Sequence, residues 1–147
     1  MKTNKYILGI VVSVLLISCG PKEIQPVDLF TDDACASCRM AISNPSFASE
    51  IINKDGTVVK FDDLRCFENY RKDHSVDDFE KIFVKDYETK VWLPFGKSIV
   101  IQTNIETPMG SGQIAVADQQ RAKALKELHP SVLAAMEGDD CCAPKED

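Results

Sequence analysis

Two cysteines separated by two residues, Cys35 and Cys38, form the clearest chemical motif of this sequence. Met40 follows the second cysteine by two positions, and Arg39 lies between them. A Cys-x-x-Cys pair acts in proteins as a redox disulfide, as half of a zinc site or as part of a site for a soft metal such as Cu(I). The other residues of the chain have to discriminate among these chemistries.

A distant methionine favours copper, because thiolate and thioether ligands together select Cu(I) over harder cations. Met109 lies in the stretch TPMGSG, where proline and glycine predict a loop and not a packed helix. We therefore interpret Met40 and Met109 as candidate thioether ligands beside Cys35 and Cys38. Cys66 lies in a predicted helix, and we interpret it as a buried structural thiol.

Three alternatives remain open. A thiol–disulfide oxidoreductase places its Cys-x-x-Cys between a core strand and a helix, whereas the acidic segment before Cys35 predicts no buried strand. A structural zinc site needs four ligands, and the only histidines, His74 and His129, lie in no ligand pairing. The last alternative is a structural surface lipoprotein stabilised by a disulfide.

The N-terminus has the features of a bacterial lipoprotein signal. A short basic stretch precedes an apolar run that is too short to span a bilayer, and the run ends in LISC at residues 16–19. We predict a signal peptide over residues 1–18 and lipidation of Cys19, which would tether the chain to a membrane of the cell envelope, facing the periplasm. Because Gly20 stands where aspartate would indicate inner-membrane retention, we expect the outer membrane.

The charge balance argues against one class of partner. The 147-residue sequence has 23 acidic and 17 basic side chains, a formal net charge of −6. Removal of the signal also removes Lys2 and Lys5, so the mature chain is more acidic still. Nucleic acids select basic surfaces, so we expect no nucleic-acid partner, while an acidic surface attracts cations.

Apolar periodicity and turn signals predict an α+β domain over residues 34–136, made of two small related halves with mostly antiparallel strands. The halves cover about residues 34–92 and 93–136. The elements expected in the first half are a hairpin with strands at 47–52 and 57–61, a helix over 63–73 and a strand over 81–86. Those expected in the second half are a strand over 98–103, a loop over 104–112, a strand over 113–117 and a helix from Asp118 to about Leu128.

Two flanking segments complete the division of the chain. Residues 19–33 contain two prolines and several charges, and we interpret them as a tether. Residues 137–147 form an acidic tail that contains Cys141 and Cys142, for which we expect an accessory role in metal binding.

Several stretches, in order, resemble the NosL family of accessory lipoproteins for nitrous oxide reductase maturation. They are CASCRMAI at 35–42, FASEIINKDGTVVKFDD at 47–63, VKDY at 84–87 and TPMGSGQIAVAD at 107–118. The resemblance spans roughly residues 33–128. It implies a fold similar to that of organomercurial lyase and a function as a membrane-tethered copper chaperone, not an enzyme, that hands Cu(I) to the maturation apparatus of a copper enzyme.

The same resemblance implies a metal site formed by Cys35, Cys38, Met40 and Met109. This chain departs from the family pattern at two positions. The family usually has glycine where this chain has Arg39, and it often has histidine where this chain has Ser111. An imidazole ligand is therefore not expected from Ser111, and the implied site is rich in sulfur.

Overall fold

The computed structural model describes residues 23–131, so Cys19, Cys141 and Cys142 lie outside the described residues. Within this range no helix has the length and apolar character needed to cross a membrane. The elements in chain order are η1 (Pro45–Phe47), β1 (Ser49–Asn53), β2 (Val58–Phe61), α2 (Leu64–Asp73), η2 (Val76–Asp78), β3 (Phe79–Lys85), β4 (Trp92–Pro94), η3 (Phe95–Lys97), β5 (Ile99–Gln102), β6 (Gln113–Val116) and α3 (Gln119–Leu128).

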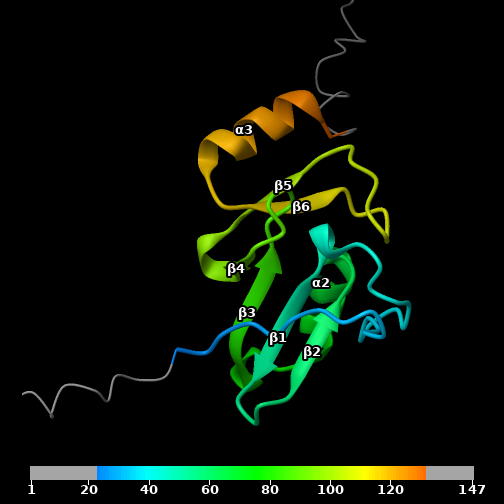
Figure 1. The fold of residues 1–147 in the computed structure, drawn as a ribbon, viewed down its shortest axis with the longest axis vertical. Helices are drawn as coiled ribbons and strands as arrows, with labels where there is room; N and C mark the ends of the chain where they lie inside the picture. Colours follow the sequence, from blue (N-terminus) through cyan, green and yellow to red (C-terminus); the bar gives the residue numbers. More distant parts are fainter. Residues whose placement is uncertain (1–22, 132–147) are drawn as a thin grey trace, which may run out of the picture.

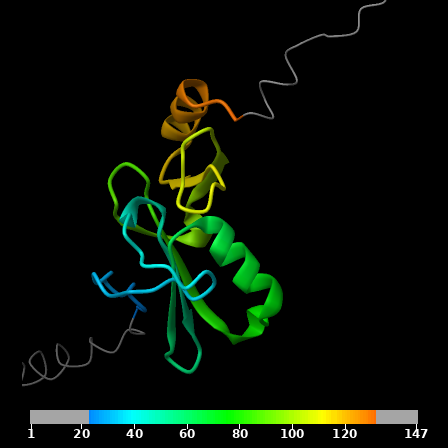
Figure 2. The same ribbon diagram turned by 90° about the vertical axis from the view of Figure 1, so that its right-hand side faces the viewer.

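The first half is an antiparallel sheet with the strand order β2-β1-β3-β4, covered on one face by α2 (Figures 1 and 2). Side chains alternate between the two faces of a strand, so residues paired across strands share a face. Ser49 pairs with Phe61 on one side and with Val84 on the other. Phe61 and Val84 therefore lie on the same face, and both belong to the core cluster that also contains Leu64 and Phe67 of α2.

Helix α2 begins as the sequence predicts. Asp63 is the N-cap residue, and its Oδ1 accepts a hydrogen bond of 2.8 Å from the backbone N–H of Arg65. Leu64, Cys66 and Phe67 are the buried residues of the helix. The first turn of α2 therefore places Cys66 in the core directly after the end of β2.

The second half is the β5–β6 antiparallel pair, covered by α3 (Figure 1). Its core cluster is formed by Phe47, Ile101, Ile114, Val116, Ala122 and Leu125. Asp118 caps α3 by accepting hydrogen bonds from two backbone N–H groups of the first turn. Leu128, the last residue of α3, is 71% exposed, because the helix ends there beyond its last buried position, Leu125.

Each half contributes a residue to the core of the other half, and a buried carboxylate also joins the two halves. Phe47, which precedes β1, belongs to the second core cluster, whereas Ala115 of β6 belongs to the first. Asp86, at the end of β3, accepts a hydrogen bond of 2.9 Å from the backbone N–H of Ala117 and forms a parallel bridge with Ala115. The structure thus confirms the expected α+β class with mostly antiparallel sheets. The similarity to organomercurial lyase stays a prediction.

Strand β4 was not expected from the sequence. It covers only Trp92–Pro94 and pairs with the end of β3, with Val84 opposite Leu93. A three-residue strand that ends in proline has no alternation to detect, and its position at the sheet edge tolerates a residue without an N–H.

The segment before the cysteine loop, which we assigned to the tether, lies against the sheet face opposite α2 (Figure 2). The backbone N–H of Val27 donates to Glu50 Oε1 at 2.8 Å. Lys60 Nζ lies 2.6 Å from the backbone oxygen of Asp28 and 2.6 Å from Asp33 Oδ2. The division into tether and domain stays a prediction, but these contacts hold residues 27–33 on the first half.

Candidate metal centre

The Cys-x-x-Cys motif forms a closed loop. Ala34 and Ala41 make an antiparallel bridge at its ends. Inside it, the backbone N–H of Cys35 donates to the oxygen of Met40 at 2.8 Å, and the N–H of Arg39 donates to the oxygen of Cys35 at 2.9 Å. These bonds fix the backbone, so the positions of both cysteines are set by the loop itself.

The loop is also tied to the sheet. The backbone N–H of Ala36 donates to the oxygen of Lys60 in β2 at 2.9 Å. This bond holds the loop next to the end of β2, from which the chain continues directly into α2. The two segments that carry the cysteines are thereby brought together.

Arg39 adopts a left-handed backbone conformation with φ of 68°. Glycine adopts this conformation freely, whereas a residue with a Cβ pays about 1–2 kcal/mol. The position at which the sequence departs from the family's usual glycine is therefore one where the loop favours glycine. The departure therefore costs stability at Arg39.

Four potential ligand atoms converge at this point. One atom from each of Cys35, Cys38, Asp62 and Cys66 lies within 4.8 Å of all the others. Cys35 is 0% exposed, while Asp62 and Cys66 are each 2% exposed, and Cys38 is only partly buried. The cluster is therefore a buried site with Cys38 nearest to solvent.

Asp62 faces the thiols. Its two carboxylate oxygens lie 3.4 and 3.6 Å from Cys38 Sγ, and it also interacts with the thiols of Cys35 and Cys66. Among residues 23–131, no Lys or Arg forms an ion pair with this carboxylate. A buried carboxylate whose hydrogen-bond donors are thiols is poorly satisfied, because the S–H group is a weak donor.

Burial sets the protonation of two of the thiols. It raises the pKa of Cys35, and the contact with Asp62 adds to the rise, while backbone N–H groups of Cys38, Asp62 and Ser37 that face the sulfur oppose it. Burial likewise raises the pKa of Cys66, again with Asp62 adding to the effect. Metal binding at this site must therefore displace thiol protons.

The net pKa change at Cys35 is upward, because desolvation and the Asp62 carboxylate outweigh the backbone N–H groups that stabilise the thiolate.

The loop over residues 104–112 is anchored by Asp63, the residue after Asp62. Asp63 Oδ2 accepts a hydrogen bond of 2.6 Å from the Thr107 hydroxyl and one of 2.9 Å from the backbone N–H of Met109. Burial opposes the ionisation of Asp63, but these bonds, the Ser111 hydroxyl and the N–H of Arg65 outweigh it and lower its pKa. The carboxylate of Asp63 thus accepts hydrogen bonds from both α2 and the Met109 loop and acts as a clamp that holds the two together.

The Thr107 hydroxyl extends the clamp through the loop. Its oxygen accepts backbone N–H groups from Ser111 at 2.9 Å and from Gly112 at 3.2 Å, and it lies 3.1 Å from the Ser111 hydroxyl. Ser111, at the position where the family often has histidine, is buried and serves this internal network. The loop is therefore rigidly built around Met109.

The structure separates the two methionines that the sequence indicated. Met109 packs against the core cluster that contains Cys35 and Cys66. Met40 is 47% exposed, and its backbone oxygen accepts a hydrogen bond from the N–H of Cys35. The structure packs Met109 against the core that contains the buried thiols and leaves Met40 at the surface of the loop. The role of each as a ligand stays a prediction.

Sequence reasoning missed two members of the cluster. Cys66 is buried as expected, but its sulfur lies among the other thiols, and Asp62 was not among the predicted ligands. The sequence did contain a signal for these two residues. Asp62 and Cys66 are four positions apart across the start of a helix that follows the hairpin directly, a spacing that can bring two side chains to the same side. Neither His74 nor His129 belongs to the cluster.

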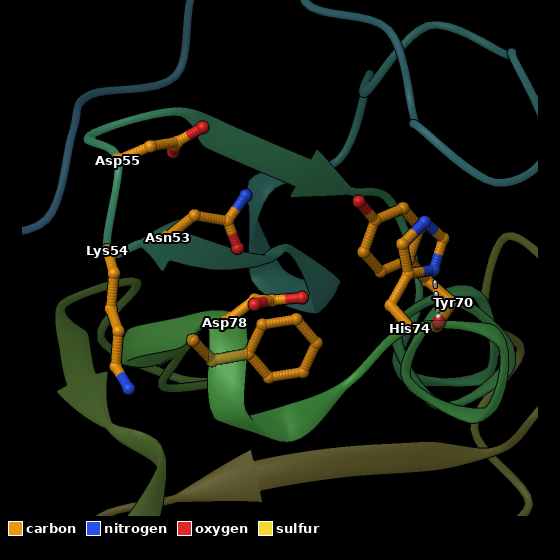
Figure 3. Close-up of a pocket in the computed structure, with 7 residues that line it drawn as sticks. Asn53, Lys54, Asp55, Tyr70, His74 and Asp78 are labelled. Carbon is orange, nitrogen blue, oxygen red and sulfur yellow. Dashed lines mark hydrogen bonds between the residues drawn. The ribbon is translucent and has the colours of Figure 1, made fainter.

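A separate polar cavity of about 310 Å³ lies at the end of the β1–β2 hairpin (Figure 3). There the rings of Tyr70 and His74 stack with centroids 3.7 Å apart, and His74 Nδ1 lies 2.8 Å from the backbone oxygen of Tyr70. The residues that line it are Asn53, Lys54, Asp55, Tyr70, His74, Asp78 and Phe79. None of them carries sulfur, so this cavity is distinct from the cysteine cluster.

The fold and the cluster together define a small α+β protein with a buried, cysteine-rich candidate metal site. The NosL family model matches residues 26–133, and the chain belongs to the NosL family. The crystal structure of the copper chaperone NosL from Shewanella denitrificans has a similar fold, with a TM-score of 0.64 and 18% sequence identity, over 76% of this chain and 91% of that chain. A comparison with curated proteins gave no match.

Proposed function

We propose that this protein is a copper chaperone that binds Cu(I) at the cysteine cluster and passes it to a copper-dependent acceptor. One observation carries the proposal: the thiols of Cys35, Cys38 and Cys66, from two segments of the chain, meet at one buried point. Soft sulfur ligands of this kind select Cu(I). Membership of the NosL family, and the name of the Shewanella denitrificans relative, support the same metal.

The geometry supports different roles for the sulfurs. Cys35 and Cys66 are buried and would hold the metal, together with Met109, which packs against the core cluster that contains them. Cys38 is partly exposed and Met40 is about half exposed, so both can be reached by an incoming ligand. Transfer would then proceed by exchange of one sulfur at a time, without release of free copper.

The partner and the location extend this proposal beyond the described residues. Lipidation of Cys19 would tether the protein to the envelope membrane facing the periplasm, with the outer membrane as the expected location. The acceptor would be the maturation apparatus of nitrous oxide reductase. The lipoprotein signal in the sequence and the family membership support these assignments.

Anaerobic competition between the reduced protein and a Cu(I) chelator tests the central claim. We expect tight 1:1 binding, lost in the double variant Cys35→Ser/Cys38→Ser because thiolates supply the affinity. The matched control is Cys141→Ser/Cys142→Ser, which removes the same number of thiols from the tail and should retain the tight site. Unchanged affinity in the first variant would place the site elsewhere.

A second pair of variants distinguishes the contributions of the two methionines to Cu(I) affinity. Met109→Leu should weaken Cu(I) binding by about tenfold, the loss of one soft ligand, and Met40→Leu should leave the equilibrium affinity almost unchanged. Leucine keeps a similar volume, so a difference in affinity reports the thioether. Equal losses in both variants would contradict the separation.

Membrane attachment and the acceptor need their own tests. Mass spectrometry of the protein from a bacterial host should show acyl chains on Cys19, and the variant Cys19→Ala should leave the membrane fraction. Loss of the protein should lower the copper content of nitrous oxide reductase in the native host. A fully loaded enzyme without this protein would remove that acceptor.

A further inference from the structure

The segment over residues 23–33, here called the strap, covers the sheet face opposite α2 (Figure 2). Two contacts fix it to the central strands. The backbone N–H of Val27 donates to Glu50 Oε1 of β1 at 2.8 Å, and Asp33 forms an ion pair of 2.6 Å with Lys60 of β2. The strap is therefore part of the folded first half and adds little free length between this half and whatever precedes it.

The strap exposes apolar side chains. Val27 is 36% exposed and Phe30 is 60% exposed. Beside them, an apolar hollow of about 430 Å³ lies between the strap and the β1–β2 hairpin, with Ile24 and Val27 on one side and Ile52 and Val58 on the other. Exposed apolar surface of this kind marks a contact with a membrane or with another protein.

The chain length between the strap and the proposed anchor decides between these two partners. Ile24, which lines the hollow, follows Cys19 by only five positions. Five residues reach at most about 18 Å even when fully extended. With acyl chains on Cys19, the hollow and the start of the strap are held within this distance of the bilayer.

We infer that the outer surface of the strap, with Val27, Phe30 and the hollow, is a membrane-contact surface that lies on the bilayer in which Cys19 is anchored. The inference rests on the proposed lipidation of Cys19. Acyl chains attach a protein to a bilayer, whereas apolar side chains buried at the boundary between headgroups and acyl chains add a second contact. That second contact sets the orientation of the domain.

The charges of the strap indicate the kind of lipid. Its exposed charged residues are Glu23, Asp28 and Asp32, all acidic. Anionic headgroups attract basic segments and repel acidic ones. The contact is therefore apolar and suits zwitterionic headgroups, so it should be insensitive to salt.

This orientation has a consequence for the proposed copper transfer. Helix α2 lies on the other side of the sheet from the strap (Figure 2), and its first turn carries Cys66. Contact through the strap turns α2 away from the bilayer. An acceptor protein can then reach the cysteine cluster without meeting the membrane.

Fluorescence quenching on vesicles tests the surface. The acylated full-length protein is placed in phosphatidylcholine vesicles whose acyl chains carry bromine near the headgroup, and the emission of Phe30→Trp is measured above that of wild type, which contains Trp92. We expect the added emission to fall by about half or more, because apolar side chains enter such an interface by about 5–10 Å. The matched control is Val76→Trp, since Val76 is 62% exposed and shares a groove with Arg71 of α2. Its added emission should be almost unchanged.

Two results would overturn the inference: equal quenching of the two variants, or no quenching of Phe30→Trp in acylated protein. Mass spectrometry of the same sample reads the anchor separately. Absence of acyl chains on Cys19 would refute the lipidation and, with it, the membrane contact.

Hydrogen exchange of the wild-type chain gives a measurement that needs no added tryptophan. Amides of residues 23–33 should exchange severalfold more slowly in the acylated protein on vesicles than in Cys19→Ala in solution, with the amides of α2 unchanged. Equal exchange of the strap in the two samples would also overturn the inference.

Discussion

Asp62 and Asp63 are consecutive buried carboxylates with opposite surroundings. Asp63 is bonded by the backbone N–H groups of Arg65 and Met109 and by the hydroxyl of Thr107. The Asp62 side chain instead faces thiols, those of Cys35, Cys38 and Cys66. One carboxylate is satisfied by N–H and hydroxyl donors of the protein, whereas the other faces thiols, which are weak donors.

The difference follows from the backbone. Asp63 has extended dihedrals, φ −152° and ψ 146°, and successive side chains of an extended chain point to opposite sides. One aspartate is thus directed to the cysteine loop and the other to the Met109 loop. The comparison teaches that burial of a carboxylate alone does not identify a site, whereas the kind of group around it does.

The largest effect that would test this comparison is on stability. Asp63→Ala should lower the free energy of unfolding by about 4 kcal/mol, because it removes a helix cap and leaves two buried donors without their acceptor. Asp62→Ala in the metal-free protein should cost about 1 kcal/mol or less, since only thiols lose a partner. Urea denaturation of both variants measures the difference, and equal losses would contradict the assigned roles.

The next largest loss of stability is expected for alanine variants of the two glycines in the Met109 loop, Gly110 and Gly112. Gly112 has φ of 65°, and a Cβ there would lie 2.4 Å from the backbone oxygen of Thr103, so Gly112→Ala should cost about 3 kcal/mol. Gly110 has φ of 63° with open space around it, so Gly110→Ala should cost only about 1 kcal/mol. Thermal denaturation should rank them in this order; a larger loss at Gly110 would mean that the loop is not held by packing at Gly112.

The lowered pKa of Asp63 predicts a pH dependence. Its pKa in the folded protein lies below the ordinary value of 3.8. The ionised form is therefore favoured by folding, and this stabilisation is present above about pH 4 and lost as pH falls through the folded pKa. The difference in unfolding free energy between wild type and Asp63→Ala should shrink from pH 6 to pH 2, and a constant difference would argue against the ionised clamp.

The pKa of Glu50 is shifted in the opposite direction, and its contribution to stability therefore has the opposite pH dependence. Burial raises the pKa of Glu50, although the N–H of Val27 and nearby lysines oppose the rise. Its protonated form is favoured by folding, so its contribution is present at acid pH and lost as pH rises through the folded pKa. The variant Glu50→Gln should therefore change the acid dependence in the opposite direction to Asp63→Ala.

The smallest effect concerns the loop that carries Cys35 and Cys38. Because Arg39 has φ of 68°, Arg39→Gly should raise the free energy of unfolding by about 1 kcal/mol, reduced somewhat by the greater freedom of glycine in the unfolded chain. Arg39→Ala keeps a Cβ and should not show this gain. A gain in the alanine variant would point to the arginine side chain and not to the backbone.

Much of the fold could be predicted from the sequence, because its signals are local. The Asp-Gly turn between two apolar runs indicated the β1–β2 hairpin, and Asp118 and the pair Asp62 and Asp63 indicated where α3 and α2 start; the structure selects Asp63 as the cap of α2. Strand β4 was missed, since the pairing of a three-residue edge strand depends on what packs against it.

For the candidate site, residue types and local spacing indicated a sulfur-rich metal loop at Cys35 and Cys38 and a second, distant loop at Met109. Only tertiary structure decided that Cys66 and Asp62 join the thiols, that Asp63 fixes the Met109 loop and that Met40 lies at the surface. The physical reason is that a metal site is defined by distances between atoms. Residues far apart in the sequence reach such distances through the packing of β2, α2 and the loops around them.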